Sequence, residues 1–456
     1  MRQAGTVRAG ITVAIAAVLA AGMPAAQART APSQTAPTTP ACRTYAAQRT
    51  AELAALDLMK TPDMQRARAA AEARWRQSWG PVSPDMEAAF PQALDELMFN
   101  AALKTVVNAT YPATMTMGID RPGRYGDTRI PGTRYGWDNT DNIYGSIPVD
   151  PHATYRLSGR MTDPGTNLNL SVWAKDGTVL SNLAKADIRA DAEGQFSLTV
   201  GMGVGFDLKL PPNAHHIMIR ETMPDWATGQ PIYIDVTRTG GPAPEPVSVH
   251  ALARAASTAV EDTIDKMQAW RQSLYREYPA NQFVTPWMGR NDNGGLPNQA
   301  LSIGHYALAD DEAVVFDIAL GGAAYFSFQS SDIWGTSGNF VDNVSTLTNK
   351  QSHANADGSF TYVVSIKDPG VQNWISTQGW HEGDVTLRWQ QITASPGTAA
   401  GPDVKARRIK LADLPTVLPA GTPRFTAAER EAQIAARARN PFSLWRDASC
   451  ATGKVR

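Results

Sequence analysis

The sequence predicts an α+β protein that is mainly β, with two tandem antiparallel β-sandwich (jelly-roll-like) domains and an amino-terminal helical region. Three observations predict this fold. Short runs of alternating apolar and polar residues fill the middle of the chain, turn residues separate these runs, and one turn motif occurs twice. Short strands at turn-punctuated intervals are typical of sandwiches.

The repeated motif has the form A-[DN]-A-[DE]-G-x-F and occurs at residues 190–196 and 354–360. Each copy leads into an alternating strand, and another apolar strand precedes each copy, at 168–172 and at 325–328. Turns of this kind are common in hairpins, so coincidence is the alternative explanation. We predict two related sandwich domains, over residues 111–239 and 281–400.

Residues 1–28 have the features of a cleavable signal peptide. Arg2 and Arg8 precede an apolar run from Ile11 to Ala21, and Ala26-Gln27-Ala28 supplies the small-x-small cleavage pattern. A membrane anchor is the alternative, but the apolar run is short for a span. The prediction is therefore a periplasmic or secreted protein cleaved after Ala28. Residues 29–41, rich in Thr, Pro and Ala, are predicted to be a disordered leader.

A helical region is predicted over residues 42–110, as a support packed on the β core. Thr61-Pro62 and Ser83-Pro84 each combine an N-cap residue with a proline at the first helical position. Pro91 is expected to interrupt the third helix. The apolar residues that recur at helical spacing in the first helix are Leu53, Leu56 and Met59.

The remaining segments connect or follow the sandwiches. Residues 240–280 are predicted to be a Pro-rich linker and a helix from about Ser248 to Tyr275. Residues 401–456 form a predicted tail, in which Thr426 and Glu429 open a short helix with a capping box. The alternating residues of the first domain predict strands at 168–172, 196–200 and 232–236.

Charge and cysteine content limit the partners and the compartment. The formal charge is −1, and removal of two arginines with the signal peptide makes it −3. Such a charge is too close to neutral to favour nucleic acid or an anionic membrane surface. The chain has two cysteines, Cys42 and Cys450, and in an oxidising compartment we expect one disulfide that joins the two ends. Two free thiols are the alternative.

The most informative stretch is residues 368–389, DPGVQNWISTQGWHEGDVTLRW, which we predict to be the functional loop. Asp368-Pro369-Gly370 has the composition of a tight turn, and Gly379 and Gly383 bracket a second bend. The strand that follows alternates with a period of two residues, with Val385, Leu387 and Trp389 on one face.

The pattern Asp-Pro-Gly-x-x-Asn-Trp, then Gly-x-x-x-Gly and Arg388-Trp389, resembles the carboxy-terminal signature of the bacterial domain-of-unknown-function family 1214. Residues 141–144, 149–151 and 155–159 are similar to the opening block of proteins with that domain, so the resemblance covers roughly residues 137–390. Here Ile375-Ser376 replaces the usual Leu-Asp, and Trp380 stands where the family has histidine, with His381 one place later. The resemblance implies a β-rich, sandwich-like fold and, because the family is uncharacterised, no activity.

Five residues are candidate catalytic groups. His381 and Glu382 could form an acid–base pair, since imidazole titrates near neutral pH and a carboxylate could orient it. Adjacent residues on a strand point apart, however, which opposes a direct hydrogen bond between them. Arg388 could bind a substrate carboxylate or form a structural ion pair. His305 and Asp332 are further acid–base candidates.

Aromatic and polar residues predict a ligand pocket between the two sandwiches. The expected aromatic walls suit a sugar ring or a hydrophobic aromatic compound. Two further polar residues beside them could bind the ligand or could simply form a turn. The candidate substrate-binding residues are Tyr144, Asp141, Asn142, Trp334, Trp374 and Trp380.

No metal or cofactor motif is recognised, and none is predicted. His215 and His216 are consecutive and face opposite sides of a strand, which disfavours a shared metal. The predicted function is an exported lyase or hydrolase acting on a carbohydrate or a hydrophobic aromatic small molecule. The alternative is a non-catalytic periplasmic protein that binds a carbohydrate or an envelope component. The predicted partner is thus a small-molecule or saccharide ligand, without nucleic acid or a membrane span; the oligomeric state is not predicted.

Overall fold

The computed structural model describes residues 40–440, except for 112, 162, 164, 244 and 290–298. The predicted signal peptide, most of the leader, and Cys450 lie outside the described residues, so export and the disulfide stay predictions. Cys42 is buried near the start of the first helix. None of the helices in the described part of the chain is both long enough and apolar enough to cross a bilayer.

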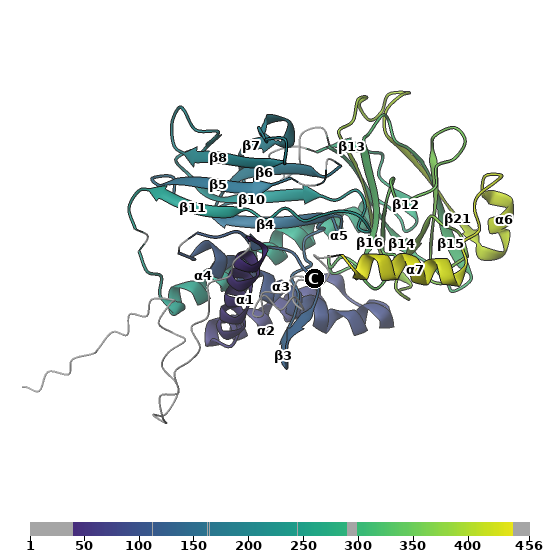
Figure 1. The fold of residues 1–456 in the computed structure, drawn as a ribbon. Helices are drawn as coiled ribbons and strands as arrows, with labels where there is room; N and C mark the ends of the chain where they lie inside the picture. The colour runs from purple at the N-terminus through teal and green to yellow at the C-terminus, as the bar shows by residue number, and fades with distance from the viewer. Residues whose placement is uncertain are drawn as a thin grey trace, which may run out of the picture.

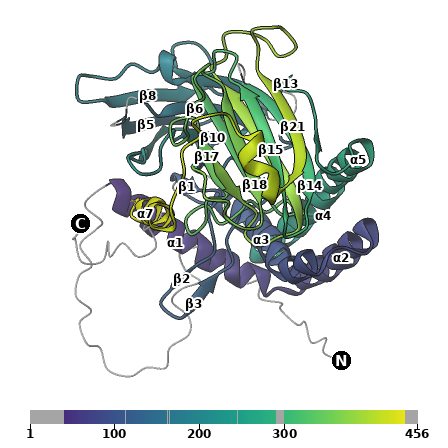
Figure 2. The same cartoon turned by 90° about the vertical axis from the view of Figure 1, so that its right-hand side faces the viewer.

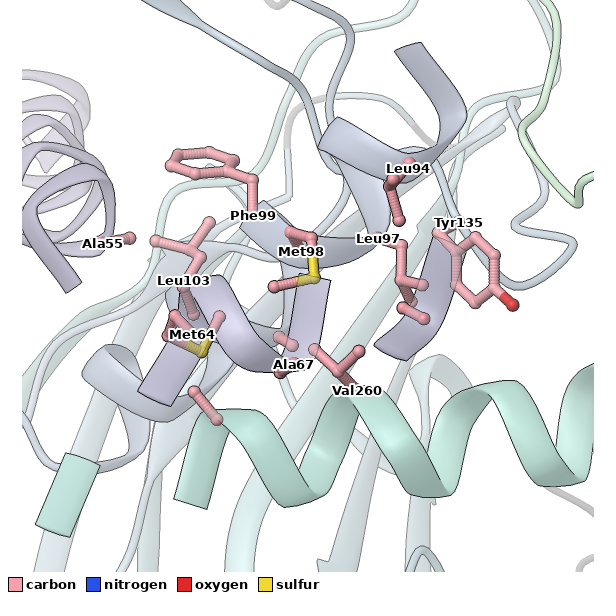
Figure 3. Packing of buried hydrophobic residues seen from close by; sticks show 14 of the residues in the cluster. Ala55, Met64, Ala67, Leu94, Leu97, Met98, Phe99, Leu103, Tyr135 and Val260 are labelled. Atoms are coloured by element: carbon pink, nitrogen blue, oxygen red, sulfur yellow. The ribbon is translucent and has the colours of Figure 1, made fainter. Parts of the chain in front are cut away.

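Helices α1 (Pro40–Met59), α2 (Pro62–Trp79) and α3 (Pro84–Asn108) lie along one side of both sandwiches, together with α4 (Val249–Thr263) (Figures 1 and 2). A π-helical turn, Ile264–Gln268, joins α4 to α5 (Ala269–Glu277). Apolar side chains from α1 to α4 share one core, which Tyr135 also enters (Figure 3). The predicted helical region therefore packs as a support on the β core.

Helix α3 runs through Pro91 without interruption, so the predicted break is wrong. A proline inside a helix removes one hydrogen bond and costs about 3 kcal/mol or more. Most of α3 is buried, including Phe90 and Leu94 on either side of the proline. Burial of this length of apolar helix outweighs the local cost, because tertiary packing supplies most of a helix's stability in a folded protein.

The first sandwich consists of a five-stranded and a four-stranded sheet. The larger sheet has the order β1 (Thr116–Met117), β4 (Asn142–Pro148), β10 (Ala214–Thr222), β6 (Asn167–Ala174), β7 (Val179–Ala184). The smaller has the order β11 (Asp235–Gly240), β5 (Thr154–Arg160), β8 (Gln195–Gly201), β9 (Leu208–Lys209). A separate hairpin, β2 (Gly123–Tyr125) and β3 (Thr128–Ile130), precedes β4.

The second sandwich has the same design. Its larger sheet has the order β12 (Gln282–Phe283), β14 (Gln299–Ala307), β20 (Glu382–Gln390), β16 (Tyr325–Ser331), β17 (Thr346–Thr348), and β13 (Trp287–Met288) also pairs with β14. Its smaller sheet has the order β19 (Trp374–Ser376), β18 (Phe360–Ser365), β15 (Glu312–Ala319), β21 (Asp403–Lys410). Strand β21 lies beyond the predicted domain end at residue 400. Helices α6 (Leu414–Val417) and α7 (Ala427–Ala438) follow, and α7 begins with the predicted capping box.

The two sandwiches have one topology, in which each strand from β4 to β11 matches the strand numbered ten higher. The two repeated turn motifs lead into β8 and β18, which occupy equivalent positions in the smaller sheets. Both β8 and β18 also pair in parallel with the strand that follows them, whereas the other pairings are antiparallel. The predicted fold class is confirmed, and the repeat marks a duplicated architecture.

The larger sheet of each sandwich has an apolar inner face and a polar outer face. In β10, Ile217 and Ile219 enter the inner core, and in β20, Val385 and Leu387 do the same. The alternate residues of both strands therefore point outwards. Arg220 lies opposite Asn169 in the register of β10 and β6. Arg388 lies opposite Ser327 in the register of β20 and β16, at the position equivalent to that of Arg220.

Candidate active site

A cleft of about 380 Å³ lies between the first half of α3 and two loops of the second sandwich. This volume is within the range of about 300–1,000 Å³ that is usual for small-molecule sites. Helix α3 contributes one wall, loop 332–339 another, and residues 378–380 a third. The lining residues are Asp85, Ala88, Ala89, Gln92, Arg134, Asp332, Thr336, Ser337, Asn339, Gln378, Gly379 and Trp380.

The wall from α3 follows from helical spacing. Residues 85, 88, 89 and 92 lie three or four positions apart and share one face of the helix. Ala88 and Ala89 are short and leave the space open. The helix begins at Ser83, whose Oγ accepts a hydrogen bond from the Met86 backbone N–H (3.3 Å). The Ser83 backbone N–H in turn donates to Glu382 Oε1 (2.8 Å), which holds the start of α3 against β20.

Loop 332–339 supplies a buried carboxyl group. Asp332 Oδ1 accepts a hydrogen bond from the Thr336 backbone N–H (2.8 Å) and closes a tight turn. Only 3% of Asp332 is exposed. Burial raises the pKa of Asp332 to about 6, although the Thr336 N–H and the charges of Arg271 and Arg134 act to lower it. The raised pKa favours the protonated form of Asp332 more than that of an exposed aspartate.

The third wall has an unusual backbone conformation. Gln378 has a φ of 59° and Gly379 a φ of 89°, both in the left-handed region, which is costly for a side chain such as glutamine. This bend directs Gln378 Oε1 to accept a hydrogen bond from the Asn339 backbone N–H (2.8 Å). Gln378 Nε2 and Thr336 Oγ1 have no hydrogen-bond partner among the described residues. Both atoms are buried in the walls of the cleft.

Asp85 lies in the first turn of α3 and is hydrogen-bonded to His381. The carboxylate accepts hydrogen bonds from the His381 backbone N–H (3.0 Å) and pairs with His381 Nδ1 (2.5 Å). The second ring nitrogen, Nε2, lies 3.0 Å from Asp310 Oδ1. Its hydrogen bond with Asp85 raises the pKa of His381. Partial burial acts to raise the pKa of Asp85, but the two hydrogen bonds from His381 outweigh it and lower that pKa.

Arg134, the cation that lines the cleft, is paired with Glu96. Arg134 Nη2 and Nε donate to the two oxygens of Glu96 (2.6 and 3.2 Å), and the Arg134 backbone N–H donates to Glu96 as well (2.8 Å). Burial acts to lower the pKa of Arg134, but Glu96 raises it more. Behind this pair, burial raises the pKa of Asp138 to about 6, while Ser337 Oγ donates to its Oδ2 (2.9 Å).

Two of the predicted site residues, Asp332 and Trp380, line the cleft. His381 does not line it but is hydrogen-bonded to Asp85, which does. The predicted pair of His381 and Glu382 does not form, because Glu382 bonds to Ser83 while His381 faces Asp85 and Asp310. Neighbouring residues at the start of β20 point apart, as the period of a strand requires.

The cleft lies between α3 and the second sandwich, whereas the aromatic pocket was predicted between the two sandwiches. Trp334 is fully buried in the helical core, where its Nε1 donates to the Met86 carbonyl (2.8 Å). Trp374 lies on β19, and its Nε1 donates to Ser365 Oγ (3.0 Å). Each indole ring is packed among other residues, and each indole N–H has a hydrogen-bond acceptor within the protein. Both tryptophans therefore stabilise the fold. Trp380 is therefore the aromatic residue that reaches the cleft.

The other predicted binding residues, Asp141, Asn142 and Tyr144, lie at the start of β4. Asp141 is fully buried and accepts hydrogen bonds from Trp226 Nε1 (3.0 Å) and Thr346 Oγ1 (3.0 Å). Tyr144 Oη accepts a hydrogen bond from the Asn139 backbone N–H (2.9 Å), and the Asn142 amide lies 3.4 Å from the same oxygen. The Asp141–Thr346 contact links the two sandwiches, whereas the contacts of Tyr144 are local, and none of these residues lines the cleft.

His305 and Arg388 also lie outside the cleft. His305 stacks on Tyr275, with ring centroids 3.9 Å apart, and its Nε2 is 2.7 Å from the Tyr278 carbonyl. Arg388 donates to the Trp137 carbonyl (2.6 Å) and to Gln329 Oε1 (3.0 Å), so neutral groups hold this buried guanidinium. The predicted structural ion pair of Arg388 is therefore replaced by hydrogen bonds to neutral acceptors.

Sequence reasoning missed Asp85, Arg134, Thr336 and Gln378. The helix start at Ser83-Pro84 gave a signal for Asp85, since it placed that carboxylate in the first turn. Nothing local indicates that Asp85 meets His381, 296 residues away. Among the described residues, no group of three His, Cys, Asp or Glu side chains is placed to hold a metal ion.

The fold is similar to that of solved structures of low sequence identity. No protein family matches the chain, and no curated protein is similar to it in sequence. An uncharacterised protein from Burkholderia cenocepacia is 22% identical, with a TM-score of 0.64 over 81% of this chain and 99% of the other. A protein from Vibrio parahaemolyticus is 11% identical, over 59% of this chain and 90% of the other, with a TM-score of 0.39. A salicylate 1,2-dioxygenase from Pseudoaminobacter salicylatoxidans is 10% identical, over 55% of this chain and 69% of the other, with a TM-score of 0.17. The protein from Burkholderia cenocepacia shares the fold, and nothing about function follows from that. The TM-scores of the other two are too low to infer a common fold.

Proposed function

We propose that the protein is an exported hydrolase that cleaves a hydroxyl-rich small molecule, such as a saccharide, in the cleft. One observation carries this proposal: two carboxyl groups of the cleft are shifted in opposite directions. Burial raises the pKa of Asp332 to about 6, while His381 lowers the pKa of Asp85. Carboxyl pairs whose environments separate their pKa values divide the roles of acid and base between them.

In the proposed reaction, the protonated Asp332 donates its proton to the leaving-group oxygen as the glycosidic C–O bond breaks. The ionised Asp85 accepts a proton from water, and the water oxygen forms the new C–O bond. The products are a sugar with a free hemiacetal and an alcohol or a second sugar, and one water molecule is consumed. His381 positions Asp85 through its ring and its backbone N–H.

The polar lining supports a hydroxyl-rich substrate over the hydrophobic aromatic compound. Polar residues, among them Thr336, Ser337 and Asn339, line the cleft and suit a ligand that carries hydroxyl groups. Trp380 supplies one half-buried aromatic surface, on which the apolar face of a sugar ring can pack. A ligand with several hydroxyl groups satisfies both kinds of surface at once.

A hydrolase is favoured over a lyase by the state of Arg134. An elimination next to a carboxylate needs a cation to stabilise the developing negative charge. Arg134 is the cation that lines the cleft, and Glu96 already engages both its Nε and its Nη2.

Export through the signal peptide at residues 1–28 is part of the proposal, as is the resemblance of residues 137–390 to family 1214.

The test is a thermal-shift screen of the exported chain against saccharides and glycosides, followed by mass spectrometry of every stabilising mixture. A ligand at a hundred times its dissociation constant adds about 2.7 kcal/mol of stability. We expect a stabilising glycoside to be hydrolysed, and Asp332→Asn to bind it with turnover reduced about 10²–10⁴-fold.

Asp57→Asn is the matched control, because this exposed carboxylate of α1 pairs with Lys60 and does not line the cleft. Equal turnover by wild type and Asp332→Asn would refute the assignment of the acid. A glycoside that stabilises all three proteins and is recovered intact would instead establish the non-catalytic carbohydrate-binding alternative.

A further inference from the structure

The start of strand β10 contains an irregularity at a pair of histidines. His216 pairs with Trp173 of β6, and the preceding pair in the register is Ala214 with Ala174. Two steps along β10 thus match one step along β6, so His215 is an extra residue without a partner on β6. This is the arrangement of a β-bulge, which changes the direction of the side chains at that point.

The two imidazole rings approach each other through the same kind of nitrogen. His215 Nδ1 and His216 Nδ1 are 3.2 Å apart. The ring centroids are 5.4 Å apart, and the rings are nearly perpendicular, at 87°. Because the nitrogens are much closer than the centroids, both nitrogens lie on the facing sides of the rings. The prediction that these side chains face opposite sides of a strand is therefore wrong, and the bulge is the reason.

Both histidines are held in place and are still reached by solvent. The His216 ring is stacked on Trp173, at a centroid distance of 6.1 Å and an angle of 24°. The His215 carbonyl accepts a hydrogen bond from the Val149 backbone N–H (3.1 Å), which ties the bulge to the residue that follows β4. Each histidine is half-buried. An ion in solution can therefore reach rings whose positions are already set.

The surroundings favour the neutral form of both imidazoles, which is the form that binds a metal ion. Burial lowers the pKa of His215, and the charge of Lys175 adds to this effect. Burial, His215 and Lys104 lower the pKa of His216 to about 3. The positive charge of Lys175 also opposes a bound cation, so we expect weaker binding than at a site with three or four protein ligands.

The separation of the two nitrogens suits a shared zinc ion. Zn²⁺ binds histidine nitrogen at about 2.0–2.1 Å in tetrahedral geometry, so two such ligands lie about 3.3–3.4 Å apart. The observed 3.2 Å would require little movement of either ring. A hydrogen bond between the rings is the alternative use of this distance, and it needs a hydrogen on one of the two Nδ1 atoms.

We propose that His215 and His216 bind one Zn²⁺ ion through their Nδ1 atoms. Among the described residues, no third His, Cys, Asp or Glu side chain is placed to join them. Water or an added ligand would therefore occupy the remaining positions around the ion. Neither histidine lines the cleft, so this site is independent of the proposed hydrolase activity.

The test is a calorimetric titration of the exported chain, without an affinity tag, with Zn²⁺. Mg²⁺ is the control ion, because it prefers oxygen ligands. We expect a saturable Zn²⁺ site that Mg²⁺ does not fill. His215→Ala and His216→Ala should each weaken Zn²⁺ binding at this site at least tenfold. His152→Ala, which removes an exposed histidine of the same sandwich, should leave it unchanged.

Side-chain ¹⁵N NMR of histidine-labelled wild type identifies the ligand atom and decides the question even if an alanine variant fails to fold. Zn²⁺ should shift the Nδ1 signals of His215 and His216 and leave both Nε2 atoms protonated.

The proposal is overturned if no saturable Zn²⁺ site is found, if both alanine variants bind Zn²⁺ like the wild type, or if the Nδ1 signals do not change. A hydrogen bond between the two rings would then account for their distance. Asp332→Asn should bind Zn²⁺ like the wild type, which separates this result from the fate of the hydrolase proposal.

Discussion

At the scale of single residues, burial decides the protonation state of several carboxyl groups. Asp332, Asp138 and Glu221 are buried and have raised pKa values, because each loses hydration that a charged form requires. Asp85 is shifted the other way, since hydrogen bonds from His381 favour its charged form. The sequence shows these residue types, but their burial depends on contacts that no local pattern reveals.

Glu221 gives the clearest prediction for stability. It points into the apolar core of the first sandwich and accepts hydrogen bonds from the Ile232 backbone N–H (3.0 Å). Burial raises its pKa from 4.5 to about 8. The folded state then binds this proton more tightly than the unfolded state, so its contribution to stability is fully present below pH 4.5 and is lost as pH rises to about 8.

We therefore expect Glu221→Gln to flatten the decline in unfolding free energy between pH 5 and 8, by on the order of 4 kcal/mol. Urea unfolding at several pH values measures this. Glu431→Gln, an exposed residue of α7, is the control and should keep the wild-type profile. A Glu221→Gln variant whose pH profile follows the wild type would show that Glu221 is ionised in the fold.

At the scale of elements, the turns and caps near the cleft could largely be read from the sequence. Ser83-Pro84 and the Thr426 capping box begin helices as predicted. Strand β21 was missed because its residues, DVKARRIK, are largely charged and it lies at the edge of its sheet, where it buries little. The bend at Gln378 could not be foreseen, since a left-handed glutamine has no sequence signature.

Gly335 tests the tight turn that carries Asp332. Its φ is 98°, and a Cβ there would lie 2.9 Å from Arg271 Nη1. Gly358, in the repeated hairpin motif, has a φ of 83° but open space around the Cβ position. We expect Gly358→Ala to cost about 1 kcal/mol from backbone strain alone. Gly335→Ala should cost about 1–3 kcal/mol more, from the clash.

Denaturant unfolding of the two alanine variants measures the difference. Because Arg271 also donates to the Asp332 carbonyl (2.8 Å), Gly335→Ala should in addition weaken ligand binding in the cleft. Equal losses of stability in the two variants would mean that the turn accommodates a side chain and does not fix Asp332.

At the scale of the whole molecule, the duplication could be predicted and the site could not. The repeated turn motif pointed to two related sandwiches, and both have the same strand order. The cleft, however, combines α3 with loops about 250 and 290 residues further along the chain. Such juxtapositions follow from how the helices pack on the sandwiches, and the predicted pocket residues Trp334 and Trp374 are buried away from this cleft.

Helix α5 and the second sandwich are joined by a buried ion pair. Arg271 of the helix α5 and Asp384 of β20 are each about 1% exposed, and Tyr275 Oη also donates to Asp384 (2.5 Å). Arg271→Met should cost about 3–5 kcal/mol, because it leaves a buried charge without its partner. Adding Asp384→Asn should recover part of that loss. Lys60→Met, which breaks an exposed pair with Asp57, should cost less than about 1 kcal/mol.

Thermal unfolding of the wild type, Arg271→Met, Asp384→Asn and the double variant gives a double-mutant cycle for the buried pair, with Lys60→Met as the exposed reference. If Arg271→Met were as mild as Lys60→Met, the junction would not depend on this pair.

The proposed hydrolase activity requires that Asp332 hold a proton that it can donate in the cleft. The most direct measurement is a carboxyl ¹³C NMR titration of protein labelled at aspartate, in which the Asp332 signal is identified by its absence from Asp332→Asn. A midpoint near pH 6 is expected, because burial raises the pKa of Asp332 to about 6. A midpoint near the ordinary value of 3.8 would contradict the account, since Asp332 would then be a fully ionised carboxylate at neutral pH and could not act as the acid.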